Sequence, residues 1–184
     1  VTKLDTAGRL VYSSYLGGDG WDEGNGIALD PGCTSQCAAY VTGWAGTPAG
    51  PGGGPFPVTA RGLACQGSRD AFATKLAPSG SSLVYSTCLA GEARLAVTVD
   101  ATGQAYVAGT VSGPLSEACP APLVLSPLGG EQDAYFVKLN PAGTAFEACA
   151  RIGSSEHDWA SAIALDIYGD GYLGGAAAVL PPPG

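Results

Sequence analysis

The sequence predicts an all-β chain made of short strands in a repeated unit. Gly and Pro supply 29 and 14 of the 184 residues, a proportion that indicates many turns. Apolar residues still make up 46% of the chain, so a packed core is expected rather than disorder. The strand-like stretches alternate apolar and polar residues, and the 3.6-residue spacing of amphipathic helices is absent.

The first pair of strands in each unit is marked by a recurring tyrosine. Three segments of similar sequence carry it at equal spacings of 66 residues: Tyr40, Tyr106 and Tyr172. Each is preceded by an apolar run that ends in an aspartate: Asp30, Asp100 and Asp166. Such internal periodicity is the signature of a repeat architecture. The aspartates are expected to hold the turn that follows the first strand.

The second pair of strands is marked by lysine. The sequence contains three lysines, and all occupy the same place in the unit: Lys3, Lys75 and Lys138. A catalytic lysine would be single, so these are expected to be structural. A four-residue turn follows each of them and ends in glycine, as type I turns favour: 5–8, 77–80 and 140–143. A further apolar strand then completes the unit.

Four short strands in about 65 residues describe one antiparallel blade of a β-propeller. Residues 25–89 and 95–152 are predicted to form two complete blades. Residues 1–16 supply the two outer strands of another blade, and residues 162–178 supply two inner strands. The predicted repeat domain therefore spans 1–178 as about three repeats, with one blade split between the termini, and a Pro-rich tail occupies 179–184.

The order of these blocks resembles the SBBP (β-propeller) repeat family of bacterial secreted and surface proteins. The residues that carry the resemblance are the blocks 24–30, 39–43, 71–80 and 83–89. The resemblance covers nearly the whole chain and implies a propeller fold and an extracellular or cell-surface location. It implies no reaction. The chain departs from the family pattern at the insertion between Cys33 and Cys37 and at the shortened loop 90–94.

The number of predicted blades limits how the chain can form a closed propeller. Propellers have typically four to eight blades, and a ring of three would be too tight at its axis. Two interpretations follow. Either the chain is a segment of a longer propeller, or separate copies complete one another's split blade and propagate head to tail into a ring or filament. The expected partners are thus copies of itself or other parts of a longer chain.

The six cysteines are expected to form three disulfides. In a four-stranded antiparallel blade, the loop that connects the second and third strands lies at the same end of the sheet as the C-terminus of the fourth strand. That placement pairs Cys65 with Cys88 and Cys119 with Cys149, and leaves Cys33 and Cys37 to close their own loop. Disulfides indicate an oxidising compartment outside the cytosol.

Two equivalent acidic loops are the candidate metal sites. Their carboxylates are Asp19, Asp22, Glu23, Glu156 and Asp158. Calcium takes several oxygen ligands, but neither loop has the spacing of an EF-hand. The favoured interpretation is that each acid caps backbone N–H groups of its own turn, with no cofactor, and calcium is the alternative.

Trp21 and Trp159 lie in the same two loops and are the candidate ligand-binding residues. Exposed indoles stack on sugar rings, whereas buried ones would wedge between blades; the wedge is the favoured interpretation. His157 is the single histidine and is expected at the surface.

Several function classes are excluded. The net charge of −8 without a basic cluster argues against nucleic acid as a partner. No stretch is long and apolar enough for a membrane helix. No catalytic constellation is present, so the protein is predicted not to be an enzyme. The predicted function is that of an extracellular structural or adhesive repeat protein, a building block of a cell-surface assembly or filament, and the alternative is a carbohydrate-binding propeller module of a larger secreted protein.

Overall fold

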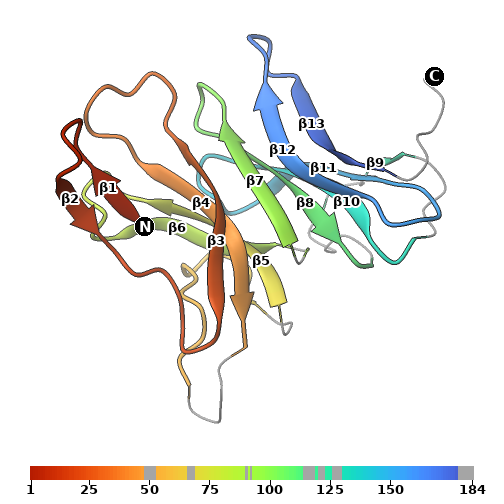
Figure 1. The fold of residues 1–184 in the computed structure, drawn as a ribbon, viewed down its shortest axis with the longest axis horizontal. Coiled ribbons are helices and arrows are strands. Elements are labelled where there is room, and N and C mark those ends of the chain that lie inside the picture. Colours follow the sequence, from red (N-terminus) through yellow and green to blue (C-terminus); the bar gives the residue numbers. More distant parts are fainter. Residues whose placement is uncertain are drawn as a thin grey trace.

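The computed structural model describes residues 1–47, 53–65, 69–89, 91, 93–113, 119, 123–125 and 130–177. These residues form strands and turns without a helix, and the strands belong to four sheets (Figure 1). The chain is therefore all-β, as the sequence predicts. The predicted tail 179–184 lies outside the described residues.

The first large sheet has four antiparallel strands in sequence order. They are β3 (Asp22–Leu29), β4 (Ala39–Gly46), β5 (Arg69–Leu76) and β6 (Leu83–Leu89). This sheet corresponds to the first complete unit expected from the sequence, although its first strand begins at Asp22 rather than at residue 25.

The second large sheet has five strands. Four of them repeat the same antiparallel order: β7 (Ala93–Val99), β8 (Ala105–Val111), β10 (Asp133–Leu139) and β11 (Phe146–Ile152). The fifth, β9 (Leu123–Leu125), pairs parallel to the outer strand β11. β9 lies in the connection between strands two and three of the unit, where the sequence predicts a loop, and that prediction is wrong for these three residues. Backbone pairing with β11 makes them a strand, which no periodicity in so short a segment reveals.

Two smaller sheets contain only a hairpin each. The N-terminal hairpin sheet pairs β1 (Thr2–Leu4) with β2 (Leu10–Ser13), and the C-terminal hairpin sheet pairs β12 (Trp159–Leu165) with β13 (Gly171–Ala176). They lie at opposite ends of the molecule and are not joined to each other by strand pairing (Figure 1).

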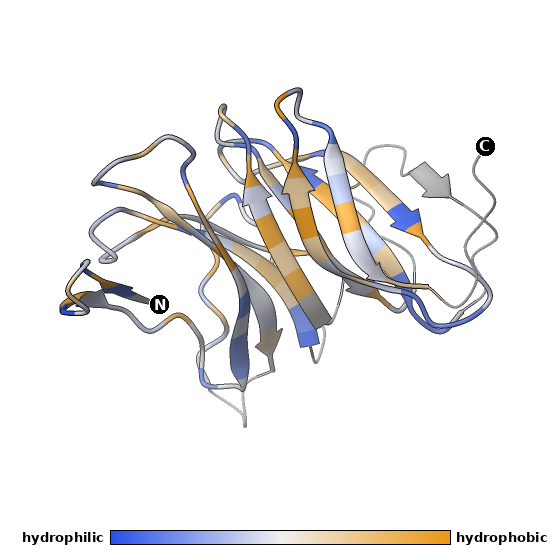
Figure 2. Cartoon of the chain, turned by 45° about the horizontal axis from the view of Figure 1, so that its top comes forward, coloured by the Kyte–Doolittle hydropathy of each residue, from blue (hydrophilic) through white to orange (hydrophobic). Residues whose placement is uncertain are grey.

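The sheets stack through the first strands of the repeats. β7 lies between β3 and β12, so that neighbouring sheets meet along these strands (Figure 1). One buried cluster fills the space between the two large sheets, and a smaller one joins the five-stranded sheet to the C-terminal hairpin sheet. A third cluster in the four-stranded sheet receives Val1 and Leu16 from the N-terminal segment. Hydrophobic residues accordingly concentrate on the strands, and turns are largely hydrophilic (Figure 2).

The pairing of the hairpins repeats in detail. The hairpins β1–β2, β5–β6 and β10–β11 each have a register shift immediately after the recurring lysine: Lys3, Lys75 and Lys138. The hairpins β3–β4, β7–β8 and β12–β13 also share a register shift near the start of their first strand. β1–β2 therefore has the local geometry of the second hairpin of a unit, and β12–β13 that of the first.

Disulfides tie the long connections to the sheets. Cys65 pairs with Cys88 of β6, Cys119 with Cys149 of β11, and Cys33 with Cys37 within one loop. This is the pairing expected from the sequence. The first two bonds anchor the connection between strands two and three onto the fourth strand of the unit, β6 or β11. A long closed loop of this kind stabilises a fold by limiting the freedom of the unfolded chain.

Candidate functional site

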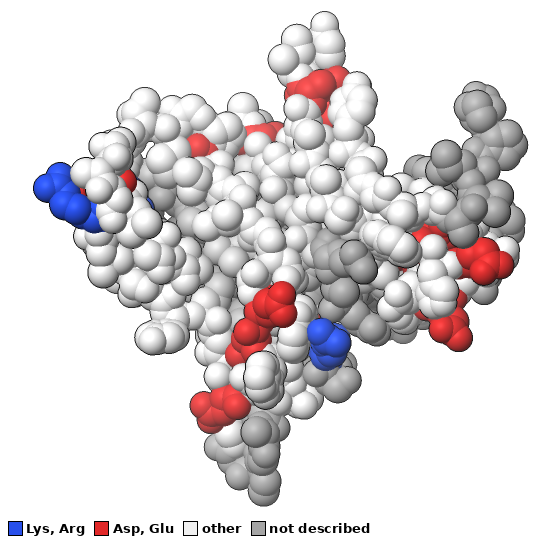
Figure 3. Space-filling model, viewed as in Figure 1, with Lys and Arg blue, Asp and Glu red and all other residues white. Residues whose placement is uncertain are grey.

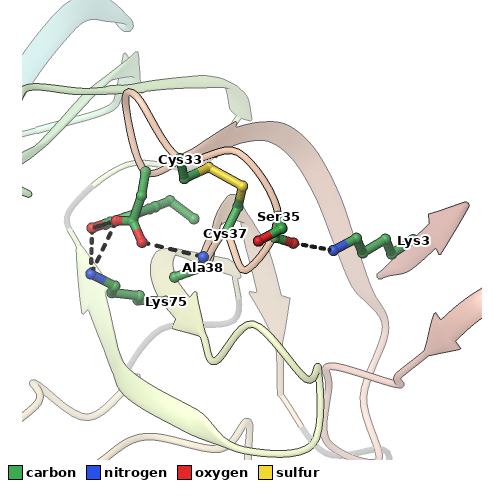
Figure 4. Close-up of a disulfide and its surroundings, with 8 residues drawn as sticks. Lys3, Cys33, Ser35, Cys37, Ala38 and Lys75 are labelled. Atoms are coloured by element: carbon green, nitrogen blue, oxygen red, sulfur yellow. Dashed lines mark hydrogen bonds and ion pairs between the residues drawn. A yellow bond between two sulfur atoms is a disulfide. The ribbon is translucent and has the colours of Figure 1, made fainter. Parts of the chain in front are cut away.

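An aspartate, a tyrosine and a lysine meet at one end of the four-stranded sheet. Tyr40 and Lys75 are direct partners across β4 and β5. The Tyr40 hydroxyl donates to Asp30 Oδ1 at 2.7 Å and accepts from Lys75 Nζ at 2.6 Å. Lys75 Nζ also lies 3.3 Å from Asp30 Oδ1. We call this arrangement the Asp–Tyr–Lys triad; it lies beside the Cys33–Cys37 loop (Figure 4).

The same three residue types come together in the five-stranded sheet, with a different ion pair for the lysine. Tyr106 and Lys138 are again direct partners, across β8 and β10. The Tyr106 hydroxyl donates to Asp100 Oδ2 at 3.0 Å, and Lys138 Nζ lies 5.0 Å from the centre of the Tyr106 ring. Lys138 also forms an ion pair of 3.8 Å with Glu147.

The triad controls the protonation of its members. Partial burial opposes the charged form of Asp30, but the hydrogen bond from Tyr40 and the charge of Lys75 outweigh it, so the pKa of Asp30 is lowered. Burial and the bond to Asp30 raise the pKa of Tyr40 well above its usual value. At neutral pH Asp30 is therefore a carboxylate and Tyr40 a neutral phenol.

The two hairpin sheets each contain one part of this triad. The C-terminal hairpin sheet contains the aspartate and the tyrosine, and the Tyr172 hydroxyl donates to Asp166 Oδ2 at 3.4 Å. The N-terminal hairpin sheet contains the lysine, Lys3, whose ammonium donates to the backbone carbonyl of Ser35 at 3.1 Å (Figure 4). Tyr172 is 62% exposed, whereas Tyr40 is 1% exposed.

The hairpin sheets also have open edges. β13 pairs only with β12, and β1 pairs only with β2, within the described part of the chain. The outer edges of the two large sheets are covered by their own connections. β9 pairs with β11, and in the four-stranded sheet the Cys88 N–H donates to the Leu63 carbonyl at 2.9 Å. An unpaired strand edge exposes a row of N–H and C=O groups that accept another strand.

One face of the four-stranded sheet is unpartnered as well. Ile27 and Leu29 of β3 are 60% and 54% exposed. Their equivalents on β7, Val97 and Val99, pack into the cluster that contains Tyr40. The difference follows from position, because β7 has a complete sheet in front of it and β3 has only the N-terminal hairpin.

The two candidate ligand-binding tryptophans differ in their surroundings. Trp21 is 84% exposed, so the expectation that it wedges between sheets is wrong. Trp159 is half-buried and lines a cavity with Ala134, Ile152 and Leu173. The five-stranded sheet stands in front of Trp159 and shields it. Trp21 lies one residue before Asp22, at the place that the exposed His157 takes before Asp158.

Asp22 and Asp158 each accept a hydrogen bond from a backbone N–H of their own loop. Asp22 Oδ2 accepts from the Gly18 N–H at 2.7 Å, and Asp158 Oδ2 accepts from the Ser154 N–H at 2.6 Å, the same bond in equivalent loops. Asp158 also accepts from the Ser154 hydroxyl at 2.8 Å.

The prediction that each acid caps N–H groups of its own turn is wrong for Asp19 and Glu23, whose partners are a distant backbone N–H and a side-chain amide. Asp19 accepts from the Gly54 N–H at 2.6 Å, and Glu23 accepts from the Asn25 amide at 2.8 Å. Glu156 is exposed, and His157 lies 3.6 Å from Glu131. Acidic side chains lie in small separate groups on the face seen in Figure 3. No cluster of three metal-ligating side chains occurs in the described ranges.

The sequence identifies every member of the triad but not their contact. Each residue type recurs at a fixed place in the repeat. The contact could have been predicted from the positions of the tyrosine and the lysine, which lie opposite each other on neighbouring strands. Comparison of the sequence with protein-family models and with curated proteins finds no match. No helix in the described segments is long and apolar enough to cross a membrane.

Proposed function

We propose that this chain is an extracellular structural building block of the β-propeller type, which joins other copies of itself by completing the split blade. The observation that carries the proposal is the pair of hairpin sheets with open edges. One has the register of the outer half of a unit and the other that of the inner half. The N-terminal half lacks the inner strands of a blade, and the C-terminal half lacks the outer strands.

The strand arrangement supports the propeller. Each large sheet is a blade-like antiparallel sheet in sequence order, and the first strands β3, β7 and β12 lie side by side as inner strands do around a propeller axis. The resemblance of the repeat to the SBBP family supports the same fold and a bacterial cell-surface location. Three disulfides are compatible with an extracellular protein.

The open edges support assembly. A strand at the edge of a sheet accepts an additional strand through main-chain hydrogen bonds, and side chains then set the specificity. Head-to-tail use of two different surfaces generates rings or filaments. A cell-surface assembly or filament is the expected product, with an adhesive or scaffolding role.

Light scattering across a range of protein concentrations tests the proposal. The chain has a mass of 18.2 kDa, and we expect species at multiples of this mass whose share rises with concentration. Negative-stain images should show rings or elongated particles of the same species. A single species of 18.2 kDa at all concentrations would contradict the proposal.

Carbohydrate binding is the second candidate, and the exposure of Trp21 favours it. An indole that is 84% exposed offers a face on which a sugar ring stacks. Titration with oligosaccharides should then change the tryptophan fluorescence, and Trp21→Ala should remove most of the change. Trp159→Ala is the matched variant in the equivalent loop, where the indole is half-buried. Equal fluorescence responses in wild type and Trp21→Ala would reject Trp21 as the binding residue.

A further inference from the structure

We propose that β13 accepts β1 of a second copy as its antiparallel neighbour, in the register that places Lys3 of the second copy opposite Tyr172. Lys3 then completes the triad begun by Asp166 and Tyr172. This inference rests on the proposed function, because it names the partner segment and the contacts of the same assembly.

The register follows from the two complete sheets. β4 and β5 pair Ala39 with Leu76 and Tyr40 with Lys75. β8 and β10 repeat this pairing with Ala105 opposite Leu139 and Tyr106 opposite Lys138.

Transfer of this pattern to the open edges fixes the intermolecular pairs. Gly171 faces Leu4, Tyr172 faces Lys3 and Leu173 faces Thr2 of the second copy. A slip by one residue would turn every side chain of β1 to the opposite face of the sheet, so the register is strongly specified.

The charges of the two halves are complementary. Asp166 accepts hydrogen bonds from backbone N–H groups and from Tyr172, and its equivalent Asp30 is paired with a lysine. Lys3 donates to a carbonyl, and its equivalent Lys75 is paired with an aspartate. The ion pairs found among the described residues include neither Asp166 nor Lys3. Docking supplies each with the opposite charge.

The apolar faces are complementary too. Within one chain, Val97 and Val99 of β7 pack against the cluster that covers Tyr40. The equivalent residues at the ends of the chain are exposed: Ile27 and Leu29 on one side, Tyr172 on the other. When β1 of a second copy pairs with β13, β3 of that copy comes to the place that β7 holds within the chain. Ile27 and Leu29 then cover Tyr172.

The N-terminal hairpin is already placed for this role. Gly143, in the turn between β10 and β11, packs against the ring of Tyr85 in the preceding sheet. Gly80, in the turn between β5 and β6, packs in the same way against the ring of Tyr12 in β2. The Ser14 hydroxyl also donates to the Gly80 carbonyl. β1–β2 therefore sits on the four-stranded sheet as β5–β6 sits on the five-stranded sheet, and a second copy docks without rearranging it.

Disulfide cross-linking between two singly substituted chains tests the register. Thr2→Cys in one chain and Leu173→Cys in the other place two thiols at directly paired positions, whose separation suits a disulfide. Mild oxidation of the mixture should give a covalent dimer at twice 18.2 kDa. The matched control mixes Lys3→Cys with Leu173→Cys, which lie on opposite faces in the proposed register. Each chain oxidised alone supplies the background.

A charge reversal tests the triad. Lys3→Glu should raise the dissociation constant of the assembly by about tenfold or more, since it sets a second negative charge beside Asp166. Arg9→Glu is the matched control on the same hairpin, because Arg9 is exposed and pairs with Asp5 in its own turn. Arg9→Glu should change the dissociation constant less than about threefold, as rim charges do. Lys3→Arg should retain assembly.

The outcomes separate the two proposals. Wild-type chains that stay at 18.2 kDa overturn the proposed function, and this inference with it. Chains that assemble but show no preference for the Thr2–Leu173 cross-link, and lose no more affinity with Lys3→Glu than with Arg9→Glu, overturn this inference alone.

Discussion

The Lys75 ammonium donates a hydrogen bond of 2.6 Å to the hydroxyl of Tyr40, its direct partner on the neighbouring strand. The hydroxyl in turn donates to Asp30, so one buried oxygen connects a cation on β5 to an anion that follows β3. Three strands of the sheet are thereby joined at one end by side chains as well as by backbone pairing. The contributions of these residues to stability can be measured one at a time.

Removal of the hydroxyl should destabilise the four-stranded sheet. Tyr40→Phe deletes a hydrogen bond to each of two charged groups, and such bonds contribute about 1.5–3 kcal/mol apiece. The direct contact between Lys75 and Asp30 remains and reduces the net loss. We expect urea unfolding to show a loss of about 2 kcal/mol. Tyr172→Phe, in dilute protein, should lose less than about 0.5 kcal/mol because that hydroxyl is exposed. Equal losses in the two variants would argue against the triad as the cause.

Stability should decline in acid through the strand-ending aspartates. Burial opposes the charged form of both Asp30 and Asp100. The hydrogen bond from Tyr40 and the charge of Lys75 nevertheless hold the pKa of Asp30 below 3.8 in the folded chain. The hydrogen bond from Thr102 does the same for the pKa of Asp100. A carboxylate whose pKa is lowered on folding stabilises the fold above the unfolded value and loses that contribution as pH falls through the folded value. The free energy of unfolding should therefore drop below about pH 4.

Urea unfolding at pH values from 6 to 2 measures this dependence. Asp30→Asn removes one titrating group and should make the acid decline shallower. An unchanged slope in Asp30→Asn would show that other carboxyl groups cause the decline.

The turn glycines should differ in their tolerance of a side chain. Gly143 has φ of 65° and a Cβ there would collide with the ring of Tyr85. Gly8 has φ of 77° in the equivalent turn, and a Cβ there would meet nothing within 4 Å. Gly8→Ala should cost about 1–2 kcal/mol for the left-handed backbone alone. Gly143→Ala should cost about 1–3 kcal/mol more because of the collision.

Thermal and urea unfolding of both alanine variants gives the comparison. The difference between them isolates the packing of one sheet on the next, since the backbone penalty is common to both. Similar losses would mean that the Gly143 turn moves away from Tyr85 at little cost.

The buried acid of the second loop should be structural. Asp158 is 1% exposed and accepts two hydrogen bonds from Ser154. Asp158→Ala should destabilise the chain by about 1–3 kcal/mol, whereas Glu156→Ala, in the same loop, should stay within about 0.5 kcal/mol. EDTA should leave the melting temperature of the wild type unchanged. A calcium site would be identified instead if EDTA lowered the melting temperature of the wild type but not that of either variant.

Local residue patterns were sufficient to predict the recurring strands and turns, β9 excepted. The repeated tyrosines, aspartates and lysines marked corresponding strands, and Gly8, Gly80 and Gly143 marked the hairpin turns, which close with backbone bonds as expected. The cysteine pairing also followed, because antiparallel order alone brings the long connection next to the last strand. These features depend on residues close in sequence or on neighbouring strands.

Stacking of the sheets decided the rest. Trp21 and Trp159 occupy equivalent loops but different positions in them. Trp21 corresponds to His157, which is exposed as well, whereas Trp159 begins β12 and lines a cavity with residues of the five-stranded sheet. β9 is a strand because β11 offers it an edge. The burial of Tyr40 and the exposure of Tyr172 likewise depend on whether another sheet follows. A repeat predicts what each unit forms, but which surfaces remain open depends on the neighbours of each unit in space.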